Sequence, residues 1–265
     1  DEALVLVLNL GDGRADGVSG ERGEAPYELL KGCRRLTEIE KNLISIFSAN
    51  VAIAFENITL NQEIIDTQKE VIFTLGEVIE SRSQETGNHV RRVAELSYLL
   101  ALKAGLDEEQ AELLRLASPM HDIGKVGVPD GILLKPGRLT PDEFEIIRRH
   151  AETGFHLLKH SRREILEAAA VAARQHHERW DGRGYPAGLK GEQIHIFGRI
   201  TAIADVFDAL LHARVYKPAW GRDEVLAYIA GERGRQFDPK LTDLLLKYGN
   251  EFIAINEKFP DETPH

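Results

Sequence analysis

The chain of 265 residues is 43% hydrophobic, which is enough to bury a sizeable core and suggests one large domain or a domain with an appendage. Its formal net charge of -10 argues against general binding to nucleic acid or to an anionic membrane, because both require a basic surface. The single cysteine, Cys33, excludes a disulfide framework and a thiolate metal site, so we expect a cytoplasmic protein.

Residues 1–35 are predicted to be the remnant of an α/β unit. Residues 3–10 have the composition of a buried strand, and residues 11–26 contain five glycines, which is typical of a loop. Because the chain begins without Met and inside the expected strand, we expect it to be a fragment of a longer protein. The apolar run at 3–8 is too short to span a bilayer, so no membrane segment is expected.

Residues 36–84 are predicted to form one long linker helix, because they contain no proline and only one interior glycine. Its apolar residues follow steps of four and three if polar Asn61 and Gln68 are included, a seam that consists of Phe47, Val51, Ala54, Ile58, Ile65, Ile72, Leu75 and Ile79. This heptad pattern predicts a parallel homodimer along residues 47–79. The alternative is that the helix folds back on the domain that follows it.

Residues 85–258 are predicted to form a run of helices, and we expect no strand after residue 10. "TPDE" at 140–143 and "SRRE" at 161–164 fit the capping-box pattern at the start of a helix. Gly105 predicts the end of a preceding helix, just before Asp107. The fold class is therefore mainly α: a helical bundle preceded by a long helix and a small α/β remnant.

Histidines and carboxylates cluster in several short stretches of this helical region. Glu85 and His89 are four residues apart, so they share one face of a helix if the helix is continuous there. Adjacent pairs occur at His121 with Asp122 and at His176 with His177. Asp205 interrupts a strongly apolar helix and would be costly to bury without a partner. Imidazole nitrogens and carboxylate oxygens without sulfur suit divalent metals such as Fe, Mn, Ni or Zn.

Each of these features also has an ordinary explanation. A single histidine is more often hydrogen-bonded in a core or exposed than bound to a metal. Glu85 and His89 could be a surface pair on a helix, and Asp205 could pair with Arg199. Only the assembly of these residues at one place would therefore favour a metal site.

Two motifs together carry a resemblance to a known family. "HDIGK" at 121–125, followed by "HHERWDGRGYP" at 176–186, resembles the HD-GYP family, a branch of the HD superfamily of metal-dependent phosphohydrolases. Further motifs of that family occur in the same order over residues 70–250: "ETGNHVRRV", "VPDGILLKPGRLTPDEF", "ADVFDAL", "RVYK" and "GRQFDP". The N-terminal remnant resembles the end of a GAF-like sensory module, as found in response regulators.

The resemblance implies an all-helical HD domain at 85–258 that hydrolyses the bacterial second messenger cyclic di-GMP to pGpG, with further cleavage to GMP left open. Two alternatives remain: a sensor that binds a cyclic dinucleotide without turnover, and a hydrolase that prefers a mixed cyclic dinucleotide. It also implies two or three divalent metal ions, with Fe or Mn favoured over Ni, Zn and Co. An upstream receiver or sensor domain is expected in the full-length chain, as in two-component systems.

The resemblance also assigns roles to individual residues. It implies eight metal ligands: Glu85, His89, His121, Asp122, His150, His176, His177 and Asp205. Asp122 and Lys125 are the expected catalytic residues. The expected substrate contacts are Lys125, Arg183, Gly184, Tyr185, Arg214 and Lys217. Gly182 and Gly184 are expected to let the backbone come close to the metals, beside a rigid lip at Tyr185 and Pro186.

Overall fold

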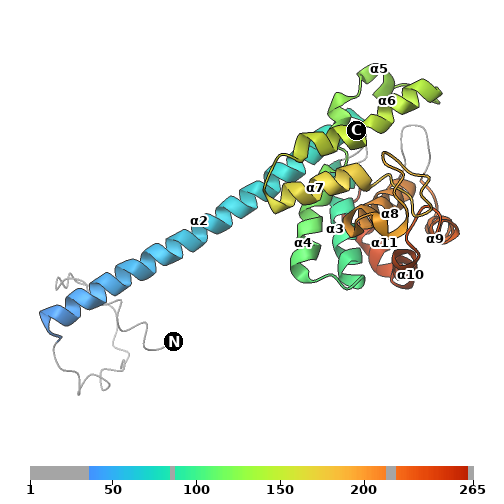
Figure 1. Cartoon of the computed structure of the whole chain (residues 1–265). Coiled ribbons are helices and arrows are strands. Elements are labelled where there is room, and N and C mark those ends of the chain that lie inside the picture. Colours follow the sequence, from blue (N-terminus) through green and yellow to red (C-terminus); the bar gives the residue numbers. More distant parts are fainter. Residues whose placement is uncertain (1–35, 84–86, 213–218, 262–265) are drawn as a thin grey trace. The chain divides into compact units, whose positions relative to one another are not determined.

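A computed structural model of the chain describes residues 36–83, 87–212 and 219–261 (Figure 1). The predicted strand at 3–10, the loop at 11–26 and the GAF-like remnant lie outside the described residues. The chain divides into two compact units, residues 1–58 and residues 59–265. The predicted domain boundaries after residues 35 and 84 stay predictions.

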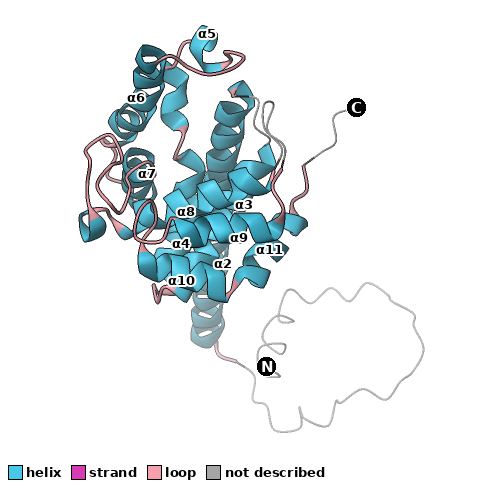
Figure 2. Ribbon diagram, turned by 90° about the vertical axis from the view of Figure 1, so that its right-hand side faces the viewer, coloured by secondary structure: helices cyan, strands magenta, loops and turns pink. Residues whose placement is uncertain are grey.

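Helices account for all the regular structure of the described residues, as the sequence predicts (Figure 2). The α-helices are α2 (Glu38–Arg82), α3 (Gly87–Lys103), α4 (Glu108–Ala117), α5 (Asp130–Leu133), α6 (Pro141–Leu158), α7 (Glu164–Gln175), α8 (Ile196–Leu211), α9 (Arg222–Gly231), α10 (Pro239–Lys247) and α11 (Gly249–Lys258). Three short 3₁₀ helices connect some of them: η2 (Ser118–Met120), η3 (Ile123–Gly127) and η4 (Gly191–Gln193).

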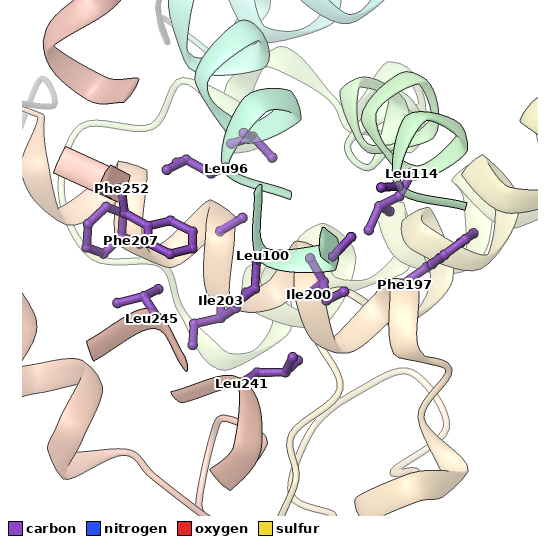
Figure 3. Close-up of a cluster of buried hydrophobic side chains, with 14 of the residues drawn as sticks. Leu96, Leu100, Leu114, Phe197, Ile200, Ile203, Phe207, Leu241, Leu245 and Phe252 are labelled. Carbon is purple, nitrogen blue, oxygen red and sulfur yellow. The ribbon is translucent and has the colours of Figure 1, made fainter. Parts of the chain in front are cut away.

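The hydrophobic core surrounds α8, which packs against α3, α7 and α9. Figure 3 shows Ile200, Ile203 and Phe207 of this helix among leucines of α3, α4 and α10. These three side chains are fully buried, and each contributes about 1.5–3 kcal/mol relative to an exposed position. The core therefore holds α3, α7 and α8 in fixed positions, and each of them carries or borders a candidate metal ligand.

The ends of the helices follow their capping residues. Thr140 and Glu143 form the predicted capping box of α6. Gly105 lies between α3 and α4, and the Asp107 side chain accepts a hydrogen bond at the start of α4, as expected. The predicted capping box at 161–164 is wrong, since Ser161 accepts instead from the Arg163 backbone amide and α7 begins only at Glu164.

The predicted long helix is confirmed as α2. In its last turns Ile72, Gly76, Ile79 and Glu80 are buried within the second compact unit. The predicted partner-facing seam is therefore wrong at Ile72 and Ile79, and the alternative of packing on the chain's own domain holds for these turns. By length and composition alone α2 is also apolar enough to cross a membrane, a criterion that some helices of soluble proteins meet as well.

Candidate metal centre

Six of the eight predicted ligands lie close together in the structure. They come from distant parts of the sequence: His89 lies on α3, His121 and Asp122 between η2 and η3, His150 on α6, and His176 and His177 directly after α7. Five of them are buried, and His177 is half-buried. Burial of so many histidines beside a carboxylate is unusual for a surface or purely structural cluster.

One group of ligand atoms is centred on the Asp122 carboxylate and comprises Asp122, His150, His176 and His177, all within 4.8 Å of one another. The Oδ1 atom of Asp122 lies 3.1 Å from His150 Nε2 and 3.6 Å from His176 Nε2. The rings of His176 and His177 lie 3.9 Å apart, centre to centre. The adjacent histidines of the sequence therefore both contribute a ring nitrogen to this group.

A second group comprises His121, His89 and Glu80, again within 4.8 Å of one another. The other Asp122 oxygen, Oδ2, lies 3.4 Å from His121 Nε2, so Asp122 borders both groups. Asp205 lies at the edge of the second group, with Oδ1 3.5 Å from His89 Nε2. It does not pair with Arg199, whose guanidinium binds Asp238 at 2.6 Å.

Glu80 was missed by the sequence analysis, and Glu85 lies outside the described residues. Glu80 is 1% exposed at the end of α2, and its carboxylate binds Lys125 Nζ at 3.0 Å. The signal in the sequence is a carboxylate that directly follows Ile79, an apolar residue of the predicted seam. A buried carboxylate requires a cation, and Lys125 supplies one.

Backbone and side-chain acceptors fix which ring nitrogen of each histidine faces the centre. Nδ1 of His121 lies 2.8 Å from the Ser118 carbonyl oxygen, and Nδ1 of His150 lies 2.6 Å from that of Ile147. Nδ1 of His176 similarly faces a carbonyl of α7 at 3.0 Å. Because carbonyl oxygens only accept hydrogen bonds, each Nδ1 carries the proton. In the neutral form of each ring Nε2 then carries the lone pair and is directed at the centre, as in many metal-binding histidines.

The ionisation states also suit metal binding. Burial lowers the pKa of His176 and lowers that of His177 well below its ordinary value. Burial opposes the ionised form of Asp122, but the charges of Lys125 and His121 outweigh it and hold its pKa well below the usual range. Burial likewise opposes the charged form of His121, yet the Asp122 charge raises its pKa to about 10. His176, His177 and Asp122 are therefore in the forms that bind metals, whereas the cationic His121 ring has to release a proton when a metal binds.

Two buried atoms of the cluster indicate that the residues present fit a metal. His121 Nε2 and Asp122 Oδ1 are inaccessible to solvent and form no hydrogen bond with any described residue. Buried polar atoms without a hydrogen bond cost about 1–3 kcal/mol each, so such atoms need a ligand. Nitrogen and carboxylate oxygen donors without sulfur suit a divalent ion of iron, manganese or zinc type. The donor set therefore could hold metal ions in two adjacent groups.

A buried network behind His89 fixes its orientation. Asp208 is fully buried and lies 2.7 Å from His89 Nδ1 and 2.6 Å from Arg92 Nε. Asn256 donates to the same carboxylate at 2.8 Å. Burial opposes ionisation of Asp208, but His89 and Arg92 lower its pKa. This role of Asp208 was not predicted from the sequence, although Asp208 follows Asp205 by three residues and shares its helix face.

Lys125 has the position expected of a residue that works beside the metal ligands. Its Nζ atom lies 2.8 Å from Asp122 Oδ2 and 3.0 Å from Glu80 Oε2, and it donates to Ser83 Oγ at 3.3 Å. The backbone at Gly124 lies so close to α6 that a Cβ at this position would be 1.9 Å from the His150 carbonyl oxygen. Glycine at this position thus lets η3 bring Lys125 and Asp122 to the centre.

The glycine-rich turn after His177 forms one wall of the centre. The Tyr185 amide donates to the His177 carbonyl oxygen at 3.2 Å, and the Tyr185 ring lies 4.6 Å from the His177 ring. The guanidinium of Arg148 lies over the Tyr185 ring, 4.6 Å from its centre. The expected lip at Tyr185 therefore lies beside the cluster.

Glu178 holds this turn in place and was also missed by the sequence analysis. It is 3% exposed, and its carboxylate accepts hydrogen bonds from the amides of Ala187 at 2.8 Å and Leu189 at 2.9 Å. Burial raises the pKa of Glu178. This role depends on contacts with residues nine and eleven positions further along the chain, which the motif around the two histidines does not reveal.

Substitution of Gly184 by alanine should displace the turn and lower activity. A Cβ there would lie 2.4 Å from the Arg179 amide nitrogen and 2.6 Å from the His177 carbonyl oxygen, so the backbone must move. We expect a loss of about 1–3 kcal/mol in the free energy of unfolding, measured by denaturant titration. Gly231→Ala is the control, because no atom of the described residues lies within 4 Å of its Cβ position. Equal stability of the two variants would contradict the close packing of the turn.

Of the remaining predicted substrate contacts, the structure describes Arg183 but not Arg214 or Lys217. Arg183 is exposed, and its backbone amide donates to Asp181 at 3.0 Å, but among the described residues no contact brings its side chain to the cluster. Arg214 and Lys217 lie outside the described residues. Their roles stay predictions.

The fold and the cluster together define the class of protein. The family model described as "HD domain" matches residues 74–241, which include every described ligand of both groups. The chain belongs to the HD domain family. A second model, "Domain of unknown function (DUF3369)", matches residues 19–64.

Among characterised relatives, the "3'3'-cGAMP-specific phosphodiesterase 2" of Vibrio cholerae is 45% identical over 86% of this chain and 44% of its own length. The "Cyclic di-GMP phosphodiesterase response regulator RpfG" of Xanthomonas campestris is 40% identical over 84% of this chain and 59% of its own length. A "Cyclic di-GMP phosphodiesterase" of Thermotoga maritima is 43% identical over 70% of this chain and 51% of its own length. The chain thus spans about half the length of the curated relatives it matches.

Two solved structures share the fold. One is a cyclic GMP-AMP specific phosphodiesterase of Vibrio cholerae, with a TM-score of 0.53 and 20% identity over 70% of this chain and 50% of that chain. The other is Bd1817, described as "a HDG'Y'P protein" from Bdellovibrio bacteriovorus, with a TM-score of 0.51 and 18% identity over 74% of this chain and 67% of that chain. Both comparisons support an HD-GYP-like fold.

Proposed function

We propose that the chain is the catalytic part of a metal-dependent phosphodiesterase that hydrolyses cyclic di-GMP to pGpG. The observation that carries the proposal is the Asp122 carboxylate, which borders two groups of ligand atoms and is surrounded by buried histidines. The names of the relatives support a cyclic dinucleotide as the substrate class. The presence of His89, His121, Asp122, His150, His176 and His177 argues against a sensor without turnover, because that alternative would be expected to lack ligands.

The residues of the centre have different roles in the proposed hydrolysis. Divalent ions held there would supply an activated water and neutralise the oxygens of the scissile phosphate. Asp122, His176 and His177 hold their donor atoms in the required ionisation states. Lys125 keeps an ammonium group at the edge of the centre, where it can stabilise negative charge on the phosphate. Tyr185 and the turn behind it limit the space in which the nucleotide lies.

The metal ions are proposed to be two or three ions of iron or manganese, with nickel, zinc and cobalt as weaker candidates. Two groups of ligand atoms support at least two ions, and the mixture of imidazole and carboxylate suits these metals. The upstream part is proposed to be the end of a GAF-like module in a cytoplasmic response regulator. The name of the Xanthomonas relative supports the response-regulator context.

A second candidate function is hydrolysis of a mixed cyclic dinucleotide, favoured by the cGAMP-specific relative with 45% identity. Metal-loaded protein is incubated separately with cyclic di-GMP and with 3'3'-cyclic GMP-AMP, and the linear products are separated by chromatography. A higher rate on cyclic di-GMP supports the proposal. A higher rate on the mixed dinucleotide assigns the alternative, and no product from either contradicts both.

Arg214→Glu should weaken binding of the cyclic dinucleotide by about ten- to a hundredfold, because a charged hydrogen bond to the ligand is lost. Bound metal should not change, since this residue is assigned to the substrate and not to the ions. The affinity is measured by calorimetry and the metal content by elemental analysis. Arg235→Glu serves as an exposed control. Loss of metal with unchanged affinity would reject the assigned role.

A further inference from the structure

The part of α2 that belongs to the second compact unit has one buried face and one exposed face. Ile72 and Ile79 are each 8% exposed, whereas Ile64 is 55%, Val71 51% and Val78 54% exposed. The exposed apolar residues recur at steps of seven, and Leu60, Thr67 and Thr74 lie between them at steps of three or four. The helix therefore presents a second heptad seam, different from the one predicted through Ile72 and Ile79.

This exposed seam has the composition of a two-stranded coiled coil. With the heptad written abcdefg, Ile64, Val71 and Val78 occupy position a, and Leu60, Thr67 and Thr74 occupy position d. In the sequence the same register continues backward through Asn57, Ile53, Asn50, Ile46, Leu43 and Ile39. β-Branched residues at a favour two strands, and Asn at a fixes register. The seam thus has the features of a dimer interface.

The rest of the domain packs on the opposite side of α2. The buried positions Ile72 and Ile79 occupy position b, Glu80 occupies c and Gly76 occupies f. Lys69, also at f, forms an ion pair with Glu112 of α4 at 2.9 Å. Positions b, c and f form the outer face of a coiled coil. The catalytic helices therefore leave positions a and d accessible to another helix.

The charges beside the seam select a parallel arrangement. Every g position from 56 to 77 is a glutamate: Glu56, Glu63, Glu70 and Glu77. In an antiparallel pair the g positions of the two helices face each other, so these carboxylates would repel. In a parallel pair each g position faces position e of the partner, which is Asn61, Gln68 or Leu75 for the first three glutamates.

The e side of the seam borders a cavity of about 750 Å³ that is lined by Gln68 and Leu75 of α2 and by Arg162 and Arg163 before α7. Both arginines are exposed. In a parallel pair, the partner's residues facing Gln68 and Leu75 are the glutamates at positions 63 and 70. A second copy of the chain would therefore bring carboxylates to the side of α2 on which these arginines lie.

We propose that this face binds a second copy of the chain as a parallel coiled coil through Leu60, Ile64, Thr67, Val71, Thr74 and Val78, with Glu63 and Glu70 of each helix directed toward Arg162 and Arg163 of the other protomer. This proposal does not depend on the proposed enzymatic function. Arg162 and Arg163 directly precede α7 (Glu164–Gln175), and His176 and His177 follow its other end.

Two neighbouring isoleucines provide a matched test. Ile64 and Ile65 are 55% and 44% exposed, but only Ile64 lies on the exposed seam, whereas Ile65 lies on the seam predicted from the sequence. Light scattering of the full chain at micromolar concentration should give twice the chain mass of 29.6 kDa for the wild type and for Ile65→Asp. Ile64→Asp should give the mass of one chain. Circular dichroism and metal content confirm that each variant is folded.

A cysteine variant tests the orientation in the Cys33→Ser background. Thr67→Cys at position d should form a disulfide-linked dimer on mild oxidation, because equivalent d positions are adjacent only in a parallel, in-register pair. Gln62→Cys, at position f, should not. Charge reversal of Arg162 and Arg163 to glutamate should weaken the dimer, and Glu63→Arg together with Glu70→Arg should restore it.

A monomeric wild type would overturn the proposal, as would dissociation by Ile65→Asp but not by Ile64→Asp. If the wild-type chain were recovered only in the membrane fraction, this would also contradict the coiled-coil dimer, because the exposed face of the helix would then contact lipid.

Discussion

Asp122→Ala should abolish hydrolysis of the cyclic dinucleotide, with a fall of about 10³-fold or more in kcat, and should lower the bound metal. The reason is the position of its carboxylate, whose two oxygens face different groups: Oδ1 lies 3.1 Å from His150 Nε2 and Oδ2 lies 3.4 Å from His121 Nε2. Removal of this side chain takes one ligand from the first group and the carboxylate that borders the second. His177→Ala should lower metal and activity in the same direction.

Metal content by elemental analysis and product formation by chromatography test this expectation together. The Asp122→Ala chain should remain folded, because Lys125 keeps its ion pair with Glu80. Asp142→Ala, an exposed aspartate in the first turn of α6, serves as the control. Full activity with normal metal content in Asp122→Ala would reject the assigned centre.

Asp208→Ala should have the largest effect on stability, a loss of about 3–5 kcal/mol in the free energy of unfolding. Asp208 is fully buried, and its removal leaves the guanidinium of Arg92, itself 1% exposed, without the nearer of its two carboxylate partners. The His89 ring also loses the acceptor for its Nδ1 proton. Denaturant titration measures the change, and a loss below 1 kcal/mol would show that the network does not stabilise the fold.

Asp208→Asn separates the effect on the metal from the effect on stability. An asparagine has the same size, but its amide group can donate to His89 Nδ1 and thereby favour the tautomer with the proton on Nε2. That tautomer cannot bind a metal through Nε2, so metal affinity should fall by about 10- to 100-fold. The loss of stability should be smaller than for alanine. Unchanged metal affinity in a folded Asp208→Asn protein would show that Asp208 does not orient the ligand.

The sequence predicted the parts of the structure that depend on local patterns or on the family motifs. The capping box at Thr140 and Glu143, the end of α3 near Gly105 and the long helix α2 are all local features, and each is confirmed. The histidine motifs identified six residues that the fold brings together. Spacing alone could not show this assembly, because α3, α6 and α7 meet only through the packing of the core.

The missed residues act through tertiary contacts that no local pattern reveals. Glu80 and Asp208 are ordinary helical carboxylates in the sequence, and only their burial against Lys125 and Arg92 gives them a role. The heptad seam predicted on α2 was wrong in the last turns of the helix for a related reason. Ile72 and Ile79 fit a heptad as well as Val71 and Val78 do, and the face that the domain covers decides between them.

Hydrolysis by one preparation of protein before and after metal removal tests whether the activity requires the bound metal. The protein is stripped with a chelator, assayed on cyclic di-GMP, reloaded with iron or manganese under anaerobic conditions and assayed again, with linear pGpG quantified by chromatography. We predict no pGpG from the stripped protein and recovery of activity in proportion to the metal bound, up to two or three ions per chain. Equal pGpG formation by stripped and reloaded protein, or none after reloading of folded protein, would contradict the metal-dependent mechanism.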